Sequence, residues 1–248
     1  MEDLTWPEVA EAIAADRPVI IPIGAASKEH GHHLPMKTDW LLARALAEGI
    51  AARLPVLIAP IVPFGYYPVF QTYPGSQHLS ADTFVRLLTE LLDRFLDQGA
   101  RRIAILNTGV STEGPIGLAT RNVLERRGVR IGVADIRRLG RGANHLLEQK
   151  TGSHADERET SIMLAIAPEL VRMERARQDY GKDSVPGVFA TPTTMQSTDA
   201  SAGDYSATGA FGDPTLASAE KGRAFLDAMI ADLVAGLVAL FPDLESDS

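Results

Sequence analysis

The chain of 248 residues contains no cysteine. Disulfide bonds, iron–sulfur clusters, cysteine-rich zinc sites and thiol nucleophiles are therefore excluded, and the composition fits a reducing compartment. No apolar run approaches the ~20 residues that a membrane-spanning helix needs. The acidic first stretch, "MEDLTWPEVAEAIAADR", does not resemble a signal peptide. We therefore expect a cytoplasmic protein that does not contact membranes.

Basic side chains are also too few to dominate the surface. Lys and Arg number 24 against 32 Asp and Glu, which gives a formal net charge of -8 at pH 7. A field of this sign repels nucleic acid and anionic membranes, and short mixed stretches such as "RNVLERRGVR" do not reverse it. We therefore expect a small-molecule substrate and no nucleic-acid partner.

The chain does contain alternating strand-like and helix-like segments. Apolar runs predict buried strands at 18–24, 55–62, 101–107 and 129–135. Helical spacing of apolar residues predicts helices at 5–16, 38–54, 81–99, 115–127, 156–168 and 215–241. This alternation predicts a single α/β domain over 1–248, with a mostly parallel central sheet covered by helices on both faces. The stretch 174–215, rich in Gly, Pro, Ser and Thr, is expected to form a lid or a subunit contact.

The loop after the first predicted strand, "SKEHGHHLPMKTD", is dense in polar side chains. Its imidazoles and its last carboxylate belong to His30, His32, His33 and Asp39. Such groups bind zinc, manganese and iron, and loops at the carboxyl ends of parallel strands are where ligands bind. If the chain stays extended past Gly24, Lys28 and His30 point into one site and Glu29 points away. The alternative is a surface loop with solvated histidines.

The loops after the next two strands carry further candidates. "PFGYYPVFQTYPGSQHLS" can form an aromatic wall around a small ligand, with Gln71, Tyr73 and His78 as polar contacts; the alternative is an aromatic cluster that covers the core. "NTGVSTEGP" offers backbone N–H groups and Ser111 to an oxyanion, but lacks the pattern of a nucleotide-binding loop. Glu113 in this turn is either a metal ligand or a first-turn acid that complements the helix dipole.

A fourth candidate segment is "GSHADERETSIMLAIAPELV". His154 lies just before a predicted helix, and Glu159 lies in its first turns. A histidine at a helix start often has a lowered pKa, which suits acid–base chemistry near neutral pH. A surface histidine beside a helix cap is the alternative.

Together these segments resemble the creatininase (creatinine amidohydrolase) family. "KEHGHHLPMKTD" is similar to the family's E-x-H-G-x-H-L-P-x-x-T-D, and "YPGSQHLS" to its F-P-G-T-x-S-L. "ILNTGVST" stands where the family has V-N-G-H-G-G-N, and "HADERETSIMLA" resembles H-A-G-x-x-E-T-S. "GAFGDPTLASAEKGRAFLD" resembles the closing G-D-P-x-x-A-x-x-E-K-G. The similarity covers nearly the whole chain in the same order.

The resemblance implies a layered α/β fold, a homohexamer and a divalent-metal hydrolase that cleaves C–N bonds in cyclic amides or formamides. Two metals share a bridging aspartate in the family, and this aspartate matches Asp39. The histidine of E-x-H, a metal ligand, matches His30. The histidine of H-A-G, a candidate acid–base group, matches His154, and the glutamate of E-T-S matches Glu159.

Two positions depart from the family pattern. The first glutamate of E-x-H, a metal ligand, is Lys28 here, and the histidine of N-G-H is replaced by Val110 if Thr108 is an insertion. Neither lysine nor valine ligates a metal, so the resemblance implies one metal (zinc, manganese or iron) or none. The third ligand beside His30 and Asp39 is then Glu113, with Glu29 as the fallback.

The sequence thus predicts a hydrolase of a small polar, cyclic molecule. A metal-activated water attacks a carbonyl with help from His154, and Lys28 replaces one metal and stabilises the oxyanion. Glu159 completes the predicted catalytic groups. The predicted substrate contacts are His33, Gln71, Tyr73, His78 and Ser111. Two alternatives are a C–C bond hydrolase of an oxidised cyclic polyol and an inactive homologue that binds or supports a partner.

Overall fold

The computed structural model describes residues 1–181 and 206–244, and its centre is a parallel sheet. The four strands lie in the order β2-β1-β3-β4. Their bounds are β1 Val19–Ile23, β2 Leu57–Ile58, β3 Ile103–Asn107 and β4 Gly132–Asp135. All neighbouring pairs are parallel, with Val19 of β1 opposite Leu57 and Ile103. The predicted fold class is confirmed.

The second strand is much shorter than the sequence predicts. Only β2 forms within 55–62, and Val62 adds an isolated bridge to Ile23. Pro55, Pro60 and Pro63 explain the difference, because proline has no N–H to donate to the ladder. The chain therefore leaves the sheet early and enters the aromatic loop.

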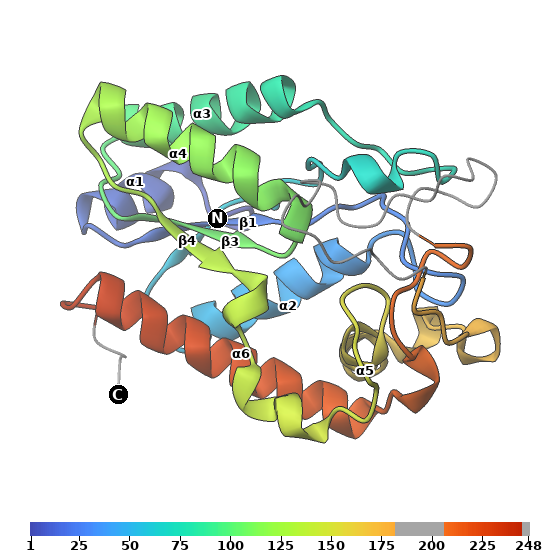
Figure 1. Ribbon diagram of the computed structural model, residues 1–248. Helices are drawn as coiled ribbons and strands as arrows, with labels where there is room; N and C mark the ends of the chain where they lie inside the picture. The colour runs from blue at the N-terminus through green and yellow to red at the C-terminus, as the bar shows by residue number, and fades with distance from the viewer. Residues whose placement is uncertain (182–205, 245–248) are drawn as a thin grey trace, which may run out of the picture.

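Helices cover both faces of the sheet (Figure 1). Helices α3 and α4 lie on one face, and α2 and α6 lie on the other. The six α-helices of the described residues are α1 Trp6–Ala14, α2 Thr38–Ala51, α3 Ala81–Asp97, α4 Glu113–Arg127, α5 Glu157–Ile166 and α6 Ala219–Leu240. Within the described ranges, no helix is both long and apolar enough to cross a bilayer. Most of the predicted lid, residues 182–205, lies outside the described residues, so that prediction stays a prediction.

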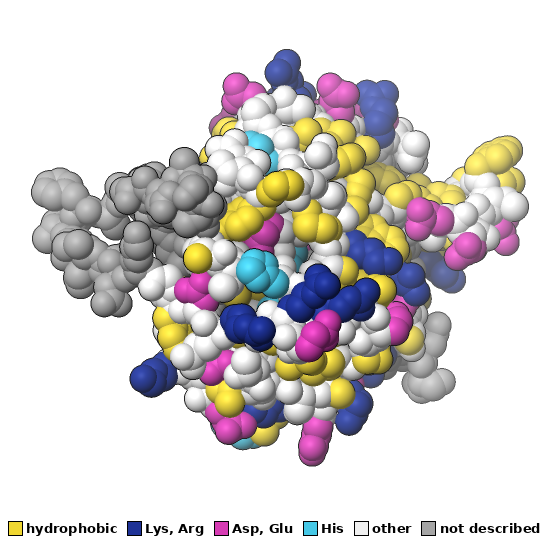
Figure 2. Space-filling view, turned by 90° about the vertical axis from the view of Figure 1, so that its right-hand side faces the viewer, with side chains coloured by type: hydrophobic (Ala, Val, Ile, Leu, Met, Phe, Trp, Pro, Cys, Tyr) yellow, Lys and Arg dark blue, Asp and Glu magenta, His cyan; other side chains and the backbone are white. Residues whose placement is uncertain are grey.

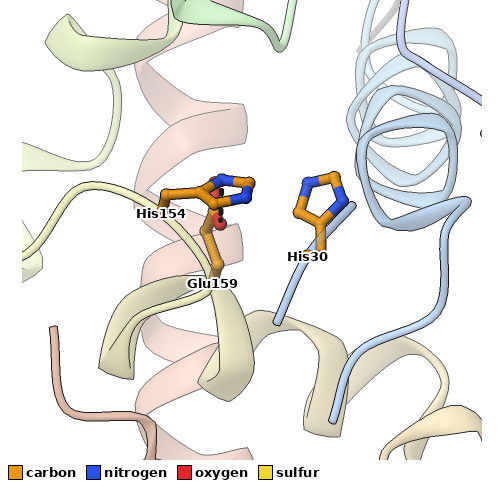
Figure 3. Close-up of side chains that lie close together, drawn as sticks. All are labelled: His30, His154 and Glu159. Carbon is orange, nitrogen blue, oxygen red and sulfur yellow. Dashed lines mark ion pairs between the residues drawn. The ribbon is translucent and has the colours of Figure 1, made fainter. Parts of the chain in front are cut away.

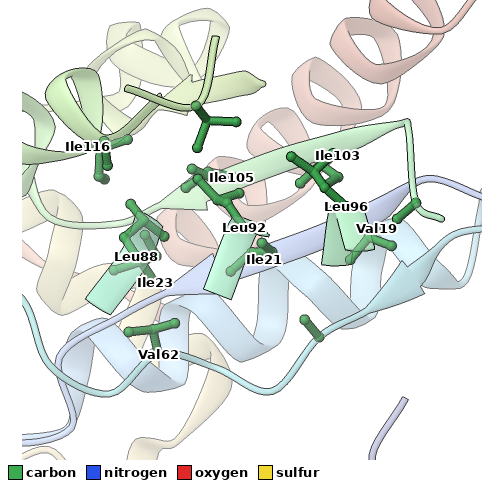
Figure 4. Packing of buried hydrophobic residues seen from close by; sticks show 14 of the residues in the cluster. Val19, Ile21, Ile23, Val62, Leu88, Leu92, Leu96, Ile103, Ile105 and Ile116 are labelled. Carbon is green, nitrogen blue, oxygen red and sulfur yellow. The ribbon is translucent and has the colours of Figure 1, made fainter. Parts of the chain in front are cut away.

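Strand alternation divides the core into two layers. Val19, Ile21 and Ile23 pack against α3 and α4, as Figure 4 shows, whereas Ile20 packs with α2 and α6 on the opposite face. Successive strand side chains point to opposite faces, so a fully apolar strand contributes side chains to both layers of the core. Strands β1 and β3 are therefore buried on both faces, and the polar loops follow their carboxyl ends.

Helices α5 and α6 pack closely against each other at a glycine. A Cβ at Gly222 would lie 1.8 Å from the carbonyl oxygen of Ser161, so only glycine fits at this crossing. At the start of α5, Asp156 accepts a hydrogen bond from the Glu159 N–H at 2.9 Å. These contacts fix α5, which carries Glu159 and begins shortly after His154.

Candidate metal centre

The end of β1 and the start of α2 bring Lys28, His30 and Asp39 together. A Cβ at Gly24 would lie 2.4 Å from the Asp39 carbonyl oxygen, so the strand end and the helix start touch through a glycine. Thr108, just after β3, donates to that same carbonyl at 3.1 Å. Asp39 is thereby held in the first turn of α2, directly beside the loop that carries the other two residues.

Asp39 bridges two partners with its two oxygens. Its Oδ2 lies 2.7 Å from Lys28 Nζ, and its Oδ1 lies 3.0 Å from His30 Nε2. All three side chains are buried. Burial alone would raise the pKa of Asp39, but Lys28 and His30 outweigh it and hold this pKa below its ordinary value. Asp39 is therefore a carboxylate at physiological pH.

The aromatic loop forms a wall beside this ion pair. Lys28 Nζ lies 5.1 Å from the ring centroid of Phe70 and 5.9 Å from that of Tyr67. Phe70 belongs to the 3₁₀ turn Pro68–Phe70, which the sequence pattern did not predict. Tyr67 donates its hydroxyl to the Gln77 carbonyl, and burial raises the pKa of Tyr67. The ammonium thus sits against ring faces, where cation–π attraction favours its charge.

Glu159 reaches the same place from the first turn of α5, and His154 reaches it from the loop just before that helix (Figure 3). The His154 ring lies near two others, with its centroid 4.7 Å from that of His30 and 4.4 Å from that of Phe70. Its Nδ1 is 3.7 Å from Glu159 Oε2. Burial raises the pKa of Glu159, and the nearby His154 opposes that shift. Ala155, between His154 and the helix, has φ 45, a left-handed conformation that is costly for alanine and aims the histidine inward.

Glu29 is a correction to the predicted orientation. The sequence argument expected it to point away, yet its Oε2 lies 3.1 Å from His154 Nε2 and its side chain is buried. The strict alternation behind that prediction fails because β1 ends at Ile23, well before Glu29. No sequence signal distinguished this carboxylate from a solvated one.

Glu113 is the second correction. Its carboxylate pairs with Arg137 at the surface, where the two side chains are 45% and 50% exposed. Helix α4 begins at Glu113 itself, so the side chain leaves the turn on the outer side instead of joining His30. Val110 is also exposed, at 46%, and Ser111 lies half-buried in the turn between them. The structure does not bring these three residues into the cluster.

The remaining predicted substrate contacts have protein partners or face solvent. His33 Nε2 meets Thr160 Oγ1 at 2.8 Å, and burial lowers the pKa of His33 to about 4. The Tyr73 hydroxyl donates to the Ser206 carbonyl at 2.6 Å. His78 accepts from the Tyr67 N–H at 3.4 Å. Gln71 is exposed. Their roles in substrate binding stay predictions.

The residues fit one divalent metal ion. His30, His154 and Glu159 each place one ligand atom within 4.8 Å of the others. Two imidazoles, a carboxylate and an open position are the donor set of catalytic zinc sites. His30 Nδ1 faces the Lys28 carbonyl at 3.0 Å and so carries hydrogen, whereas Nε2 faces Asp39, another acceptor. A proton or a metal ion between His30 Nε2 and Asp39 Oδ1 would satisfy both of these acceptor atoms.

The surface around this edge mixes charge with apolar groups. Figure 2 shows the end of the molecule that lies on the right in Figure 1, where histidine, lysine, arginine and acidic side chains gather among hydrophobic ones. The fold and the buried cluster together define a layered α/β protein with a candidate metal centre at the carboxyl ends of its strands.

Comparison with known proteins places the chain in a family. A family model described as creatinine amidohydrolase matches residues 2–237. The chain belongs to the creatininase family, whose members are metal-dependent hydrolases. The resemblance found in the sequence motifs is therefore confirmed.

The relatives differ in what they act on. The mycofactocin precursor peptide peptidase of Mycobacterium tuberculosis is 30% identical over 90% of this chain and 86% of its own length. The creatinine amidohydrolase of Pseudomonas putida is 27% identical over 97% and 96% of the two chains. The 3-dehydro-scyllo-inosose hydrolase of Thermotoga maritima is 25% identical over 75% of this chain and 61% of its own.

Solved structures agree with the fold. A manganese form of creatininase superposes with a TM-score of 0.82 at 25% identity and covers 98% of both chains. A creatininase variant of the zinc–zinc type has a TM-score of 0.84 at 24% identity. Solved creatininases thus include forms with manganese and with zinc.

Proposed function

We propose that this chain hydrolyses an amide-type C–N bond in a small polar, cyclic substrate, with one divalent metal and with Lys28 in the place of a second. The observation that carries the proposal is the bridging contact of Asp39. One of its oxygens meets the Lys28 ammonium at 2.7 Å and the other meets His30 at 3.0 Å. In the family pattern this aspartate bridges two metals, so a lysine now occupies one side of the bridge.

Lys28 supplies fixed positive charge where a substrate carbonyl would bind. Its ammonium has three hydrogens, and among the described residues Asp39 is its one ion-pair partner. Attack of water on a carbonyl carbon puts negative charge on the carbonyl oxygen, which the other Lys28 hydrogens stabilise. The C–N bond then breaks, and the leaving nitrogen takes up a proton that the attacking water released. The aromatic wall of Tyr67 and Phe70 keeps this charge out of bulk water.

His30, His154 and Glu159 would hold the metal. A divalent metal lowers the pKa of water so that water attacks at neutral pH. His154 and Glu159 then act as ligands in place of the acid–base and catalytic roles that the sequence predicted. The ligand set also differs from the predicted His30, Asp39 and Glu113. Glu113 lies at the surface, and the two oxygens of Asp39 face Lys28 and His30.

Two observations favour amide chemistry over the alternatives. The peptidase and the amidohydrolase are relatives whose names denote cleavage of amide-type C–N bonds, and both cover most of the chain. The inosose hydrolase matches a shorter part of both chains, so C–C cleavage of a cyclic ketone is the second candidate. Burial of the Lys28–Asp39 ion pair costs desolvation free energy, and catalysis accounts for this cost whereas an inactive homologue does not. A homohexamer and a cytoplasmic location remain further parts of the proposal, from the family resemblance and the composition.

Metal content and a substrate panel test the proposal together. Protein purified without added metal is analysed by elemental mass spectrometry, and we expect close to one equivalent of zinc, manganese or iron. Glu159→Gln should lose most of this metal, whereas Glu169→Gln, an exposed carboxylate of the same region, should keep it. The panel contains lactams, formamides, short peptides and cyclic ketones. Absence of metal together with absence of hydrolysis would favour the inactive homologue.

A further inference from the structure

Glu29 is a buried carboxylate at the variable position of the E-x-H motif. Its side chain is 8% exposed. Two oxygens of Glu29 face the same atom. Its side-chain Oε2 and its main-chain carbonyl oxygen each lie 3.1 Å from His154 Nε2. One residue therefore surrounds one nitrogen of the histidine ring with two acceptors.

Two acceptors at Nε2 determine which nitrogen carries hydrogen. A main-chain carbonyl has no hydrogen to give, so the contact requires that Nε2 donate. The other ring nitrogen, Nδ1, then faces Glu159 Oε2 at 3.7 Å. Nδ1 is thus the nitrogen that lies on the side of the cluster with Glu159.

Two glycines keep the Glu29 carboxylate in this orientation. Gly31 donates its N–H to Oε1. Gly209, with φ +75, packs so closely that a Cβ there would lie 1.9 Å from the same oxygen. A side chain at 209 would displace the carboxylate. Gly31 and Gly209 therefore both contact the carboxylate through their backbone and leave it room.

We infer that Glu29 is a positioning residue for His154, which fixes the ring with hydrogen on Nε2 and offers Nδ1 to the metal ion. Carboxylates that hold the outer nitrogen of a metal-bound histidine fix its tautomer and raise its strength as a ligand. The part of this inference that concerns the metal rests on the proposed function. The part that concerns the tautomer does not, because it follows from contacts within the chain.

The tautomer is measured first, on the full chain with metal removed. Long-range ¹H–¹⁵N spectra of histidine-labelled protein report which ring nitrogen carries hydrogen, and His154 is assigned by the loss of its signals in His154→Asn. We expect hydrogen on Nε2. A neutral ring with hydrogen on Nδ1 alone would overturn the inference whether or not the protein binds metal or hydrolyses anything.

Metal affinity is measured second, by calorimetric titration with Zn²⁺. Glu29→Gln removes the charge with little change of shape, and Glu29→Ala also removes the side-chain acceptor. We expect both to weaken zinc binding by about 10- to 100-fold, the usual effect of losing such a partner. Glu113→Gln, a surface carboxylate paired with Arg137, is the matched control and should bind zinc like the wild type.

The outcomes separate the inference from the proposed function. Equal zinc affinity in the wild type and both Glu29 variants, with thermal melts that show folded protein, contradicts the positioning role. A wild type that binds no zinc contradicts the metal part of both proposals, and the NMR spectrum then decides the tautomer by itself. Gly209→Ala, which crowds the carboxylate without removing it, should weaken zinc binding in the same direction as Glu29→Gln.

Discussion

Two lysines of this protein, Lys28 (buried) and Lys221 (half-buried), use their ammonium hydrogens in different ways. Lys221, at the start of α6, donates to three acceptors: Glu157 at 2.5 Å, Glu148 at 2.6 Å and the Leu216 carbonyl at 3.0 Å. Burial would lower the pKa of Lys221, but its two carboxylate partners outweigh it and raise this pKa. All three ammonium hydrogens are matched by acceptors, and the lysine ties α6 to α5 and to the turn before it.

Lys28 is more deeply buried than Lys221, with 7% of its side chain exposed against 15%, and its ammonium has fewer acceptors. Within residues 1–181 and 206–244, Asp39 is its one ion-pair partner, and the rings of Phe70 and Tyr67 lie 5.1 and 5.9 Å from its Nζ. A buried ammonium with unmatched hydrogens costs free energy unless a ligand uses them. The comparison therefore separates Lys221, which joins α6 to α5, from Lys28, whose remaining hydrogens we propose are used by a substrate.

The largest expected effect is on catalysis by Lys28→Met. Methionine keeps the length of the side chain and removes the charge, so hydrolysis of the substrate found in the panel should fall by about 10²- to 10³-fold, as for loss of one oxyanion donor. Lys37→Met, an exposed lysine of the same loop, is the control and should keep full kcat. Equal kcat/KM in the two variants would remove Lys28 from the reaction.

Lys221→Met should show the opposite pattern. It leaves Glu157, which is fully buried, without its cation, and breaking a buried pair costs about 3 kcal/mol of unfolding free energy. Two backbone N–H groups, of Glu148 and Gln149, still satisfy that carboxylate and keep the cost at the lower end of the range. Urea unfolding measures the loss, with exposed Lys150→Met as the control. If Lys221→Met abolished kcat in protein that is still folded, the division between the two lysines would be wrong.

The fold was predictable because its signals are local. Apolar runs gave β1 and β3 with bounds within a residue or two, and Ser80 caps α3 by accepting a hydrogen bond from the Thr83 N–H at 3.3 Å. The strand predicted at 55–62 is too long, because the apolar pattern of this segment indicates a strand while its prolines interrupt the ladder of hydrogen bonds. The short 3₁₀ turn Pro68–Phe70, which supplies the aromatic wall, has no periodicity to detect.

The site was only partly predictable, because its geometry is tertiary. The family motifs pointed to His30, Asp39 and His154, and the structure brings these residues together. Alternation misplaced Glu29, since it assumed that the chain stays extended beyond the sheet. Glu113 was chosen by nearness in sequence, and one turn of α4 is enough to direct it outward. The direction of a side chain that leaves a loop depends on packing that no short window of sequence contains.

His33→Gln tests the link between the loop of Lys28 and α5. His33 hydrogen-bonds Thr160, which lies on the same helix as Glu157. Its folded pKa of about 4 lies below the ordinary value of 6.5, so the unfolded chain binds a proton first as the pH falls. The wild type should therefore lose up to about 3 kcal/mol of stability as the pH falls from 6.5 to 4, and none of this loss above 6.5.

The variant should lose less over the same interval, because glutamine does not titrate. Urea unfolding at a series of pH values measures both slopes. His145→Gln, an exposed histidine, is the matched control and should keep the slope of the wild type. A parallel pair of slopes for His33→Gln and the wild type would show that other groups cause the pH dependence.

The smallest expected effect is that of Glu113→Gln, which breaks the ion pair with Arg137. This third carboxylate–cation pair differs from those of Lys28 and Lys221 in that both of its partners are about half exposed. Water and salt screen such a pair, and its loss should change the unfolding free energy by about 0–1 kcal/mol. Metal content and kcat should not change. A Glu113→Gln protein that lost its metal would bring Glu113 back as a ligand and would mean that burial, which separates the three pairs here, is a poor guide to function in this fold.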